Sequence, residues 1–306
     1  MQAERYRATC QLVDQLAPHG RGARRQFCDA TVIKVYLFAT QSDRPVSWAC
    51  RVQHWPQRLL DELLCGNLPS QSTMSRRMRT VGVQQLLERV QAKLAQMLQQ
   101  EAQEDSVVKA IDSKPLRVSR FSKDRDTKNG RAAGDMSRGY KLHAITVGKA
   151  FLHWTLTPMN TSEQTAAAWL LPKLSDGAGA WGYITADNGY DSNALHALAR
   201  RMNHQLLSPP RRSNADVRVT RDNHPARLRA LDLFADPLSH CGQPSAFAQS
   251  MRDNREQIER NFAHAVMHGL NHPPPWVRTP HRVASWIAAK LIQSMVRQLQ
   301  IKRLIA

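Results

Sequence analysis

Ile184-Thr185-Ala186-Asp187-Asn188-Gly189-Tyr190-Asp191-Ser192 is a short apolar run that ends in a carboxylate and continues at once into Asn-Gly. The run predicts a buried strand and Asn-Gly predicts a turn, so we expect Asp187 at the C-terminal end of a strand. Open α/β sheets bind their ligands at that end. Aspartate also begins turns and caps helices, so a turn residue is an equally good interpretation of Asp187 taken alone.

The same pattern occurs earlier in the chain. Residues 107–112, Val-Val-Lys-Ala-Ile-Asp, form a second β-branched run that ends in an aspartate, and Ser113-Lys114-Pro115 predicts a turn after it. Asp112 therefore repeats the arrangement of Asp187. Two carboxylates at strand ends converge if their strands are neighbours in one sheet.

Elements of both kinds surround these two strands. Alternating apolar and polar residues on either side of Gly148-Lys149 predict a hairpin. Further predicted elements are a helix that begins near Asn160, a helix over 193–202 with Asp191 as its N-cap, and a strand over 205–207. Residues 117–138 are rich in Arg and Lys and predict a mobile basic loop, and 213–250 carry few periodic signals. His143 and His153 are expected within strands, and Trp154, Trp169, Trp181 and Trp286 in the core.

Two helices are predicted near the C-terminus. Residues 251–265 have Ile258, Phe262 and Ala265 on one apolar face, and Arg255 and Glu259 lie one turn apart on this helix. Thr279-Pro280 is typical of a helix start with proline at the first position.

Residues 1 to about 100 are predicted to be mainly helical. Residues 59–79 contain a helix, a Gly66-Asn67 stop, a Pro69-Ser70 start with Ser70 as N-cap, and a second short helix. The second helix has Gln71, Ser72, Ser75, Arg76 and Arg79 on a polar side while Met74 and Met78 face inward. This arrangement favours a helix-turn-helix that reaches bases and phosphates. A basic amphipathic helix with an ordinary solvated face is the alternative.

The charge of the chain is strongly positive. The 306 residues include 43 Lys and Arg against 25 Asp and Glu, a net charge of +18. This surplus favours a polyanionic partner, most often nucleic acid, over the alternative of a merely basic surface. Five widely spaced cysteines without a Cys-x-x-Cys pair predict reduced thiols in a cytosolic protein. No apolar segment predicts a membrane span, and the charged start lacks the apolar core of a signal peptide.

Four motifs in order resemble the DDE transposases of bacterial insertion sequences. The motifs are Ala110-Ile111-Asp112-Ser113, Gly139 to Ala144, Thr185 to Ser192, and Arg255-x-x-x-Glu259. The resemblance covers about residues 107–300, and it implies an α/β fold with a ribonuclease H-like mixed sheet and flanking helices, preceded by a mainly helical DNA-binding region. We therefore expect a DNA-end-binding region over 1–104 and a catalytic domain with a helical C-terminal tail over 105–306.

The resemblance also implies a site and partners. Asp112, Asp187 and Glu259 would be the catalytic carboxylates that hold two Mg²⁺ ions, for which Mn²⁺ can substitute. Further residues are expected to contact DNA, namely Arg255, Arg211, Arg212, Lys141, Ser75, Arg76, Arg77 and Arg79. The implied partners are double-stranded DNA, both element ends and target, and a second copy of the chain in a homodimer on paired ends. The implied location is the bacterial cytoplasm, at the nucleoid, without a membrane partner.

The chain departs from the family pattern at two motif positions. Arg252 stands where many relatives have Tyr, and Val266 stands where they have Lys. Glu256, three residues before Glu259, is a rival third ligand, although only Glu259 keeps the spacing to Arg255. A catalytically inactive, transposase-derived DNA-binding regulator is therefore an alternative function. A ribonuclease H-like nuclease that cuts without joining is another.

Overall fold

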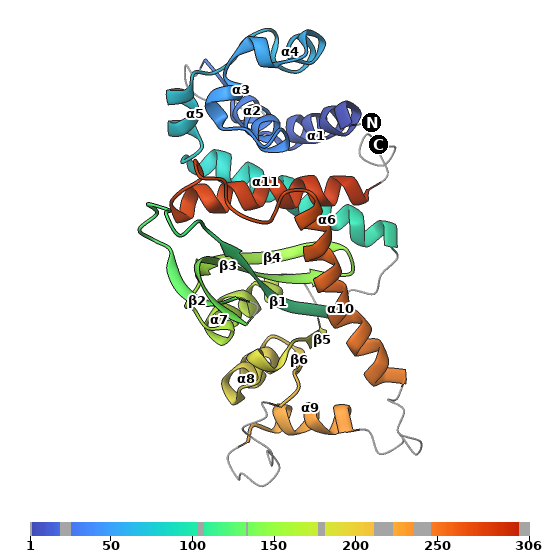
Figure 1. Ribbon diagram of the computed structural model, residues 1–306. Coiled ribbons are helices and arrows are strands. Elements are labelled where there is room, and N and C mark those ends of the chain that lie inside the picture. The colour runs from blue at the N-terminus through green and yellow to red at the C-terminus, as the bar shows by residue number, and fades with distance from the viewer. Residues whose placement is uncertain are drawn as a thin grey trace. The chain divides into compact units, whose positions relative to one another are not determined.

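The computed structural model describes residues 2–18, 26–102, 107–132, 134–176, 181–210, 223–235 and 246–299. It divides into two compact units, which we describe separately (Figure 1). The first unit combines Met1–Leu98 with His264–Ala306, and the second is Gln99–Ala263.

The first unit is helical. Its elements are α1 (Gln2–Leu16), α2 (Asp29–Gln41), α3 (Val46–Ala49), the 3₁₀ turn η1 (Val52–His54), α4 (Gln57–Leu64), α5 (Gln71–Arg77), α6 (Val81–Ala102) and α11 (Pro280–Gln298). The C-terminal helix α11 belongs to this unit by its contacts. Lys290 of α11 donates to the carbonyl of Thr40 at 2.9 Å and to the Asp43 carboxylate at 2.6 Å. The C-terminal tail, which we expected within the catalytic domain, therefore packs with the N-terminal helices.

The helix-turn-helix segment has the predicted local structure. Ser70 is the N-cap of α5, and its hydroxyl accepts from the Thr73 amide at 3.2 Å. Helix α4 ends at Cys65, which is in the left-handed region with φ +49°. Met74 and Met78 are buried, as the amphipathic pattern predicted. The exposed side of α5 is consequently polar and basic.

The second unit is an α/β fold. Its strands are β1 (Val108–Arg117), β2 (Lys128–Ala132), β3 (Asp135–Val147), β4 (Ala150–Pro158), β5 (Gly182–Thr185) and β6 (His204–Leu207). Its helices are α7 (Glu163–Leu170), the 3₁₀ turns η2 (Leu171–Asp176) and η3 (Asn188–Tyr190), α8 (Asn193–Arg201), α9 (Pro225–Ala235) and most of α10 (Ala246–Met267).

The sheet is mixed, with strand order β2-β3-β1-β5-β6, and β4 also pairs with β3. Strands β1 and β3 are antiparallel, as are β3 and β4, whereas β1, β5 and β6 are parallel. Through β4 instead of β2, the strand order is β4-β3-β1-β5-β6, in which β5 and β6 run parallel to β1. This is the ribonuclease H-like mixed sheet that the resemblance implied. The predicted fold class, including the preceding helical region, is therefore confirmed.

Helices cover both faces of this sheet because successive side chains of a strand point to opposite sides. Ile111, Ile184 and Leu206 pack against α7 and α8 in one apolar cluster. Their neighbours Val108, Tyr183 and Leu207 pack on the other side against residues of α9 and α10. The two faces of β1 and β5 therefore meet different helix pairs.

The structure corrects several local predictions. Residues 117–138 contain β2 and the start of β3, so only residues 118–127 form a loop, and Arg138 donates to the carbonyls of Ser122 and Asp124 within it. Helix α9 lies in a stretch that carried few sequence signals. Ser192 rather than Asp191 caps α8. Trp286 is buried and Trp154 is partly buried, but Trp169 and Trp181 are 54% and 62% exposed and are not core residues.

Candidate active site on the mixed sheet

The strand register brings the two predicted aspartates level with each other. Ala110 of β1 pairs in parallel with Thr185 of β5. Continuing both chains by two residues places Asp112 opposite Asp187. The two strands are neighbours, as convergence of the carboxylates requires.

Asp112 lies within its strand rather than at its end. Strand β1 continues to Arg117 because its other edge still pairs with β3, while its pairing with β5 ends at Ala110. The predicted turn at residues 113–115 is therefore wrong, because these residues are part of β1. Asp112 is thus held by backbone hydrogen bonds on one side and is free of a neighbouring strand on the other. Since Asp112 shares the face of Val108, it points toward the side of the sheet that α10 covers.

Asp187 follows β5 and begins the turn η3. Its carboxylate accepts from the Gly189 amide at 2.8 Å, and its carbonyl accepts from the Ser208 hydroxyl. Asp187 therefore does what the turn interpretation predicted and also stands beside Asp112. The turn interpretation of this residue is therefore confirmed, and its role as a ligand stays a prediction.

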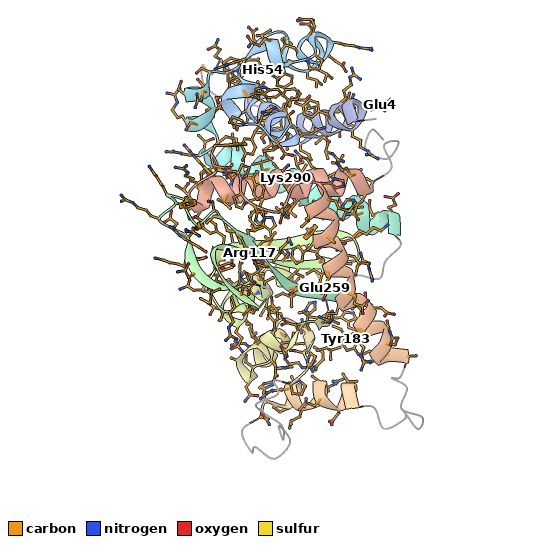
Figure 2. The ribbon with its side chains drawn as sticks, in the orientation of Figure 1. Glu4, His54, Arg117, Tyr183, Glu259 and Lys290 are labelled. Atoms are coloured by element: carbon orange, nitrogen blue, oxygen red, sulfur yellow. The ribbon has the colours of Figure 1, made fainter. Side chains whose placement is uncertain are left out.

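Two other carboxylates act on Asp112 in this region. Burial, together with the negative charges of Asp187 and Glu259, raises the pKa of Asp112 to about 7. The Ser113 amide, which donates to Asp112 at 2.7 Å, and the Arg255 guanidinium oppose this rise in pKa. Asp187 and Glu259 are therefore both close enough to Asp112 to repel it, although the three residues come from a strand, a turn and a helix. Figure 2 labels Glu259 on α10.

Helix α10 contributes Glu259 and Arg255. The two side chains are joined by an ion pair of 3.1 Å, one helical turn apart. Glu256, the rival third ligand, pairs instead with Arg260 at 3.5 Å. Only Glu259 acts on Asp112, so the geometry favours Glu259 over Glu256.

A hollow of about 520 Å³ lies beside Asp187. Pro209 and Pro210, which follow β6, form part of its wall, and Arg252, Arg255 and Glu256 of α10 form another part. Arg252, at the position where many relatives have Tyr, thus brings a second guanidinium to the same hollow as Arg255. The sequence singled out Arg252 as a departure from the family pattern but did not indicate that its side chain lines this hollow.

The donor chemistry of these side chains suits a divalent metal ion. Hard cations such as Mg²⁺ take oxygen ligands, and the mutual repulsion that raises the pKa of Asp112 would be relieved by a bound cation. Within the described ranges, no three histidine, cysteine or acidic side chains lie close enough together to hold one ion. Because Glu259 is paired with Arg255, a site made of all three carboxylates requires Glu259 to leave that pair.

A buried ion pair involves Asp191, the residue directly after the turn that follows Asp187. Arg227 of α9 donates to both carboxylate oxygens of Asp191, at 2.7 and 2.6 Å, and both side chains are buried. The sequence indicated Asp191 only as a helix cap, because its partner lies 36 residues further along the chain. This pair ties α9 to the motif that contains Asp187.

The residues predicted to contact DNA fall into three groups. Ser75 and Arg76 are exposed on α5, and Arg79 is exposed just after it. Arg77 is buried instead, with its guanidinium on the Asp29 carboxylate and on the carbonyl of Phe27 at 2.7 Å, so it is a structural residue. Arg255 lines the hollow described above, while Arg211 and Arg212 lie outside the described residues.

Lys141 is likewise not a free surface cation. Its ammonium group lies 2.7 Å from the Glu163 carboxylate and also donates to the carbonyl of Thr161 at 3.3 Å. The side chain is 11% exposed. Lys141 therefore joins β3 to the start of α7.

Sequence and structure comparisons identify the family. The Transposase DDE domain family matches residues 103–279, which is more than half of the chain. The chain belongs to this family. The transposase has no significant match among curated proteins. Within its described residues, no helix combines the length and apolar character that crossing a membrane requires.

The solved structures similar to this transposase include other transposases. A piggyBac transposase synaptic complex with hairpin DNA shares 11% identity, with a TM-score of 0.48 over 99% of this chain and 75% of the other. A Mos1 strand transfer complex shares 12% identity, with a TM-score of 0.26 over 80% of each chain. A Mos1 mariner paired end complex with Mn shares 12% identity, with a TM-score of 0.24 over 80% of each chain.

Proposed function

We propose that this chain is the transposase of a bacterial insertion sequence. It binds the terminal inverted repeats of the element, cuts phosphodiester bonds at the element ends and joins the resulting 3′-hydroxyls to target DNA. The observation that carries this proposal is the parallel register that sets Asp112 level with Asp187, with Glu259 acting on the same carboxylate. Membership of the DDE family gives that cluster its chemistry.

Asp112 and Asp187 would be the rigid ligands of two divalent metal ions. One lies within a strand and the other accepts an amide hydrogen bond in a turn, so neither carboxylate needs to be ordered before it binds a cation. Glu259 would complete the ligand set from α10. When bound, two such ions activate the attacking oxygen and stabilise the leaving oxygen of an in-line displacement. Mg²⁺ is the expected ion, and Mn²⁺ would substitute for it.

Arg252 and Arg255 would hold the DNA strand that is cut. Both line the hollow beside Asp187, and guanidinium groups bind phosphate oxygens in a bidentate manner. Arg255 would therefore exchange the Glu259 carboxylate for a phosphate when DNA enters. Arg211 and Arg212, Ser75 of α5, and its exposed neighbours Arg76 and Arg79 would contact the DNA backbone and bases. We further infer a homodimer on paired ends and a location at the bacterial nucleoid.

The alternative function is an inactive regulator that binds DNA and does not cut it. Two observations favour it, namely Arg252 and Val266 at the motif positions and the ion pair that engages Glu259. An inactive protein should show no saturable binding of Mn²⁺ that depends on Asp112 and Asp187. Calorimetric titration of the wild type and of the Asp112→Asn variant separates the two functions.

The direct test is a cleavage assay on DNA that carries matched element ends. We expect cutting with Mg²⁺ or Mn²⁺, and joining to a second DNA, in the wild type but not in the Asp187→Asn variant. Equal cutting by the variant would refute the site. Cutting without joining, under any condition, would indicate a nuclease rather than a transposase.

A further inference from the structure

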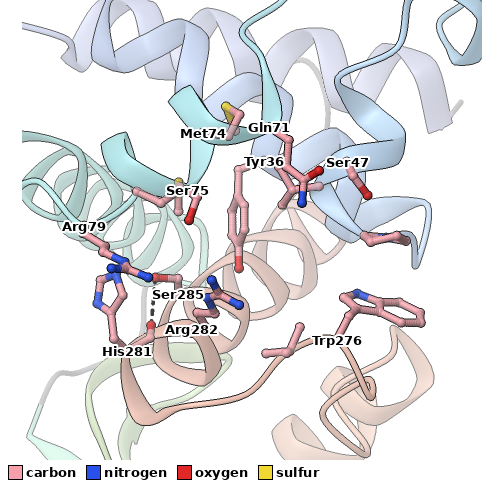
Figure 3. A pocket seen from close by; sticks show the side chains of 14 residues that line it. Tyr36, Ser47, Gln71, Met74, Ser75, Arg79, Trp276, His281, Arg282 and Ser285 are labelled. Carbon is pink, nitrogen blue, oxygen red and sulfur yellow. Dashed lines mark hydrogen bonds between the residues drawn. The ribbon is translucent and has the colours of Figure 1, made fainter.

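A second hollow, of about 360 Å³, lies within the helical unit. Its walls come from α2, from the residues around α3, from α5, and from the segment that leads into α11 (Figure 3). Residues far apart in sequence, such as Gln71 and Trp276, therefore share one site. The volume is within the range of about 300–1,000 Å³ that is typical of small-molecule sites.

The charge of this second hollow is positive. Arg79, which follows α5, and Arg282 of α11 line it together with His281, and all three are exposed. None of the described residues that line the hollow is Asp or Glu. Arg77, two residues before Arg79, is paired with the Asp29 carboxylate, whereas no ion pair between described residues involves Arg79 or Arg282. The hollow therefore offers two guanidinium groups to an anion.

The start of α11 adds to this preference for an anion. Pro280, His281 and Arg282 form its first turn, directly after the N-cap Thr279. Amide groups of a first helical turn and the helix dipole both favour negative charge. Thr279 has φ +77°, a conformation that side-chain-bearing residues rarely adopt and that is found most often at functional sites.

The opposite side of the hollow is aromatic. Figure 3 shows Trp276 across the hollow from Arg79, His281 and Arg282, with the Tyr36 hydroxyl between them. Trp276 is 44% exposed, so one large aromatic surface is left open to a ligand. Burial raises the pKa of Tyr36, and Arg282 opposes this rise, so the hydroxyl stays protonated beside the guanidinium as a hydrogen-bond donor. A ligand that satisfies both sides has an anionic group at one end and a planar ring at the other.

We propose that this hollow binds a single nucleotide, with its phosphate at Arg79 and Arg282 and its base against Trp276. The inference rests on the proposed function, in which DNA is the partner, and names a place where an unpaired nucleotide of that DNA is held. A base within a duplex is stacked on both faces, so only an unpaired or extruded nucleotide reaches such a hollow. Stacking of a base on an aromatic side chain does not depend on sequence. A free nucleotide has the same chemistry.

The test is equilibrium binding to the full chain, measured by fluorescence anisotropy in the Asp187→Asn background so that the DNA stays intact. One probe is a blunt duplex, the second is the same duplex with a single-stranded overhang, and the third is a fluorescent deoxynucleoside monophosphate. The variants are Trp276→Ala, Arg282→Ala and Arg79→Ala. The matched controls are Arg58→Ala and Arg278→Ala, because both remove an exposed arginine that does not line the hollow.

We expect Trp276→Ala to weaken binding of the overhang about tenfold while binding of the blunt duplex stays within about twofold. Arg282→Ala and Arg79→Ala should weaken the overhang more than either control does. If these three variants also lose binding of the monophosphate, the result would support the proposal and identify a free nucleotide as a second source of the ligand. Equal weakening of blunt and overhanging DNA by all five variants would overturn it, because the arginines would then be general phosphate contacts. Thermal melts within about 2 °C of the wild type exclude unfolding as the cause.

This outcome is independent of the proposed cleavage activity. Binding to the overhang needs neither the carboxylates nor a metal ion. A chain that binds the overhang through Trp276 but never cuts DNA would refute the transposase activity and leave the hollow intact. A chain that cuts DNA, and whose binding of the overhang is unaffected by Trp276→Ala, would refute the nucleotide site and leave the transposase activity intact.

Discussion

The α/β unit gathers negative charge on one face of its sheet, whereas the helical unit gathers positive charge around a hollow. Asp112 and Asp187 are fixed by the strands and turns that carry them, and burial already raises the pKa of Asp112. Arg79 and Arg282 stand on flexible side chains at the surface. The carboxylates of the α/β unit are therefore held rigidly and repel one another before any ligand binds. The arginines at the hollow of the helical unit are neither rigid nor in repulsion. Substitutions should therefore affect chemistry and stability in the α/β unit, and mainly affect binding in the helical unit.

The largest expected effect distinguishes the two candidate glutamates of α10. Glu259→Gln should lower the rate of DNA cleavage about 10⁴-fold, about 5 kcal/mol of lost transition-state stabilisation, since it would remove a ligand of the proposed metal site. Glu256→Gln should change the rate less than about fivefold, because Glu256 pairs with Arg260 and does not act on Asp112. Single-turnover cleavage of a matched-end duplex measures both rates. If Glu256→Gln has the larger effect, the assignment of the third ligand is reversed.

The next effect is on the stability of the α/β unit. Arg227→Met should lower the free energy of unfolding by about 3–5 kcal/mol, because it removes the guanidinium that binds both oxygens of the buried Asp191 carboxylate. Urea unfolding followed by circular dichroism measures this change. The double variant Asp191→Leu with Arg227→Met should recover part of the loss, since neither charge then remains buried alone. A single variant as stable as the wild type would show that the pair does not hold α9 to the sheet.

A smaller effect separates two arginines of the helical unit. Arg77→Ala should lower the free energy of unfolding by about 2 kcal/mol, because its guanidinium is buried on Asp29 and on a backbone carbonyl. Arg79→Ala should change it by less than about 0.5 kcal/mol, since Arg79 is exposed. Thermal and urea denaturation of the two variants provides the comparison. Equal stability of both would mean that the ion pair of Arg77 contributes little.

The smallest effect is a dependence of stability on pH. Burial lowers the pKa of His143 to about 4 in the folded chain, below its ordinary value of 6.5. As the pH falls, the unfolded chain therefore binds a proton at this histidine before the folded chain does. The contribution of His143 to stability is complete above pH 6.5 and is lost as the pH falls from 6.5 toward 4. His143→Gln should reduce the slope of stability against pH in that window by at most about 1.4 kcal/mol per pH unit.

His281→Gln is the matched control for this pH dependence. His281 is exposed at the hollow of the helical unit, so its variant controls for the replacement of a histidine that is not buried. Urea unfolding at several pH values between 4 and 7 gives both slopes. Equal slopes for the two variants and the wild type would contradict a neutral, buried His143.

The sequence predicted most of the elements because their signals are local. Residues 107–112 and 184–186 are short apolar runs, Gly148-Lys149 lies between two alternating stretches, and Ser70 and Pro280 mark helix starts. Each signal depends on neighbours within a few residues. Helix α9 was missed because its place depends on Arg227, whose partner Asp191 is remote in sequence. Trp169 and Trp181 were assigned to the core on residue type alone, which does not fix which side of an element faces solvent.

The sequence alone determined which residue types are available and in what order, namely two aspartates after apolar runs, a glutamate on a later helix and a surplus of cations. Only the tertiary structure decided how they are used. Parallel pairing of β1 with β5 set Asp112 beside Asp187, and burial of Arg77 left Arg79 as the exposed arginine of the second hollow. The contacts of α11 joined the C-terminal tail to the N-terminal helices. The physical reason is that propensity and periodicity act over one or two turns, whereas strand pairing and burial join residues that are far apart along the chain.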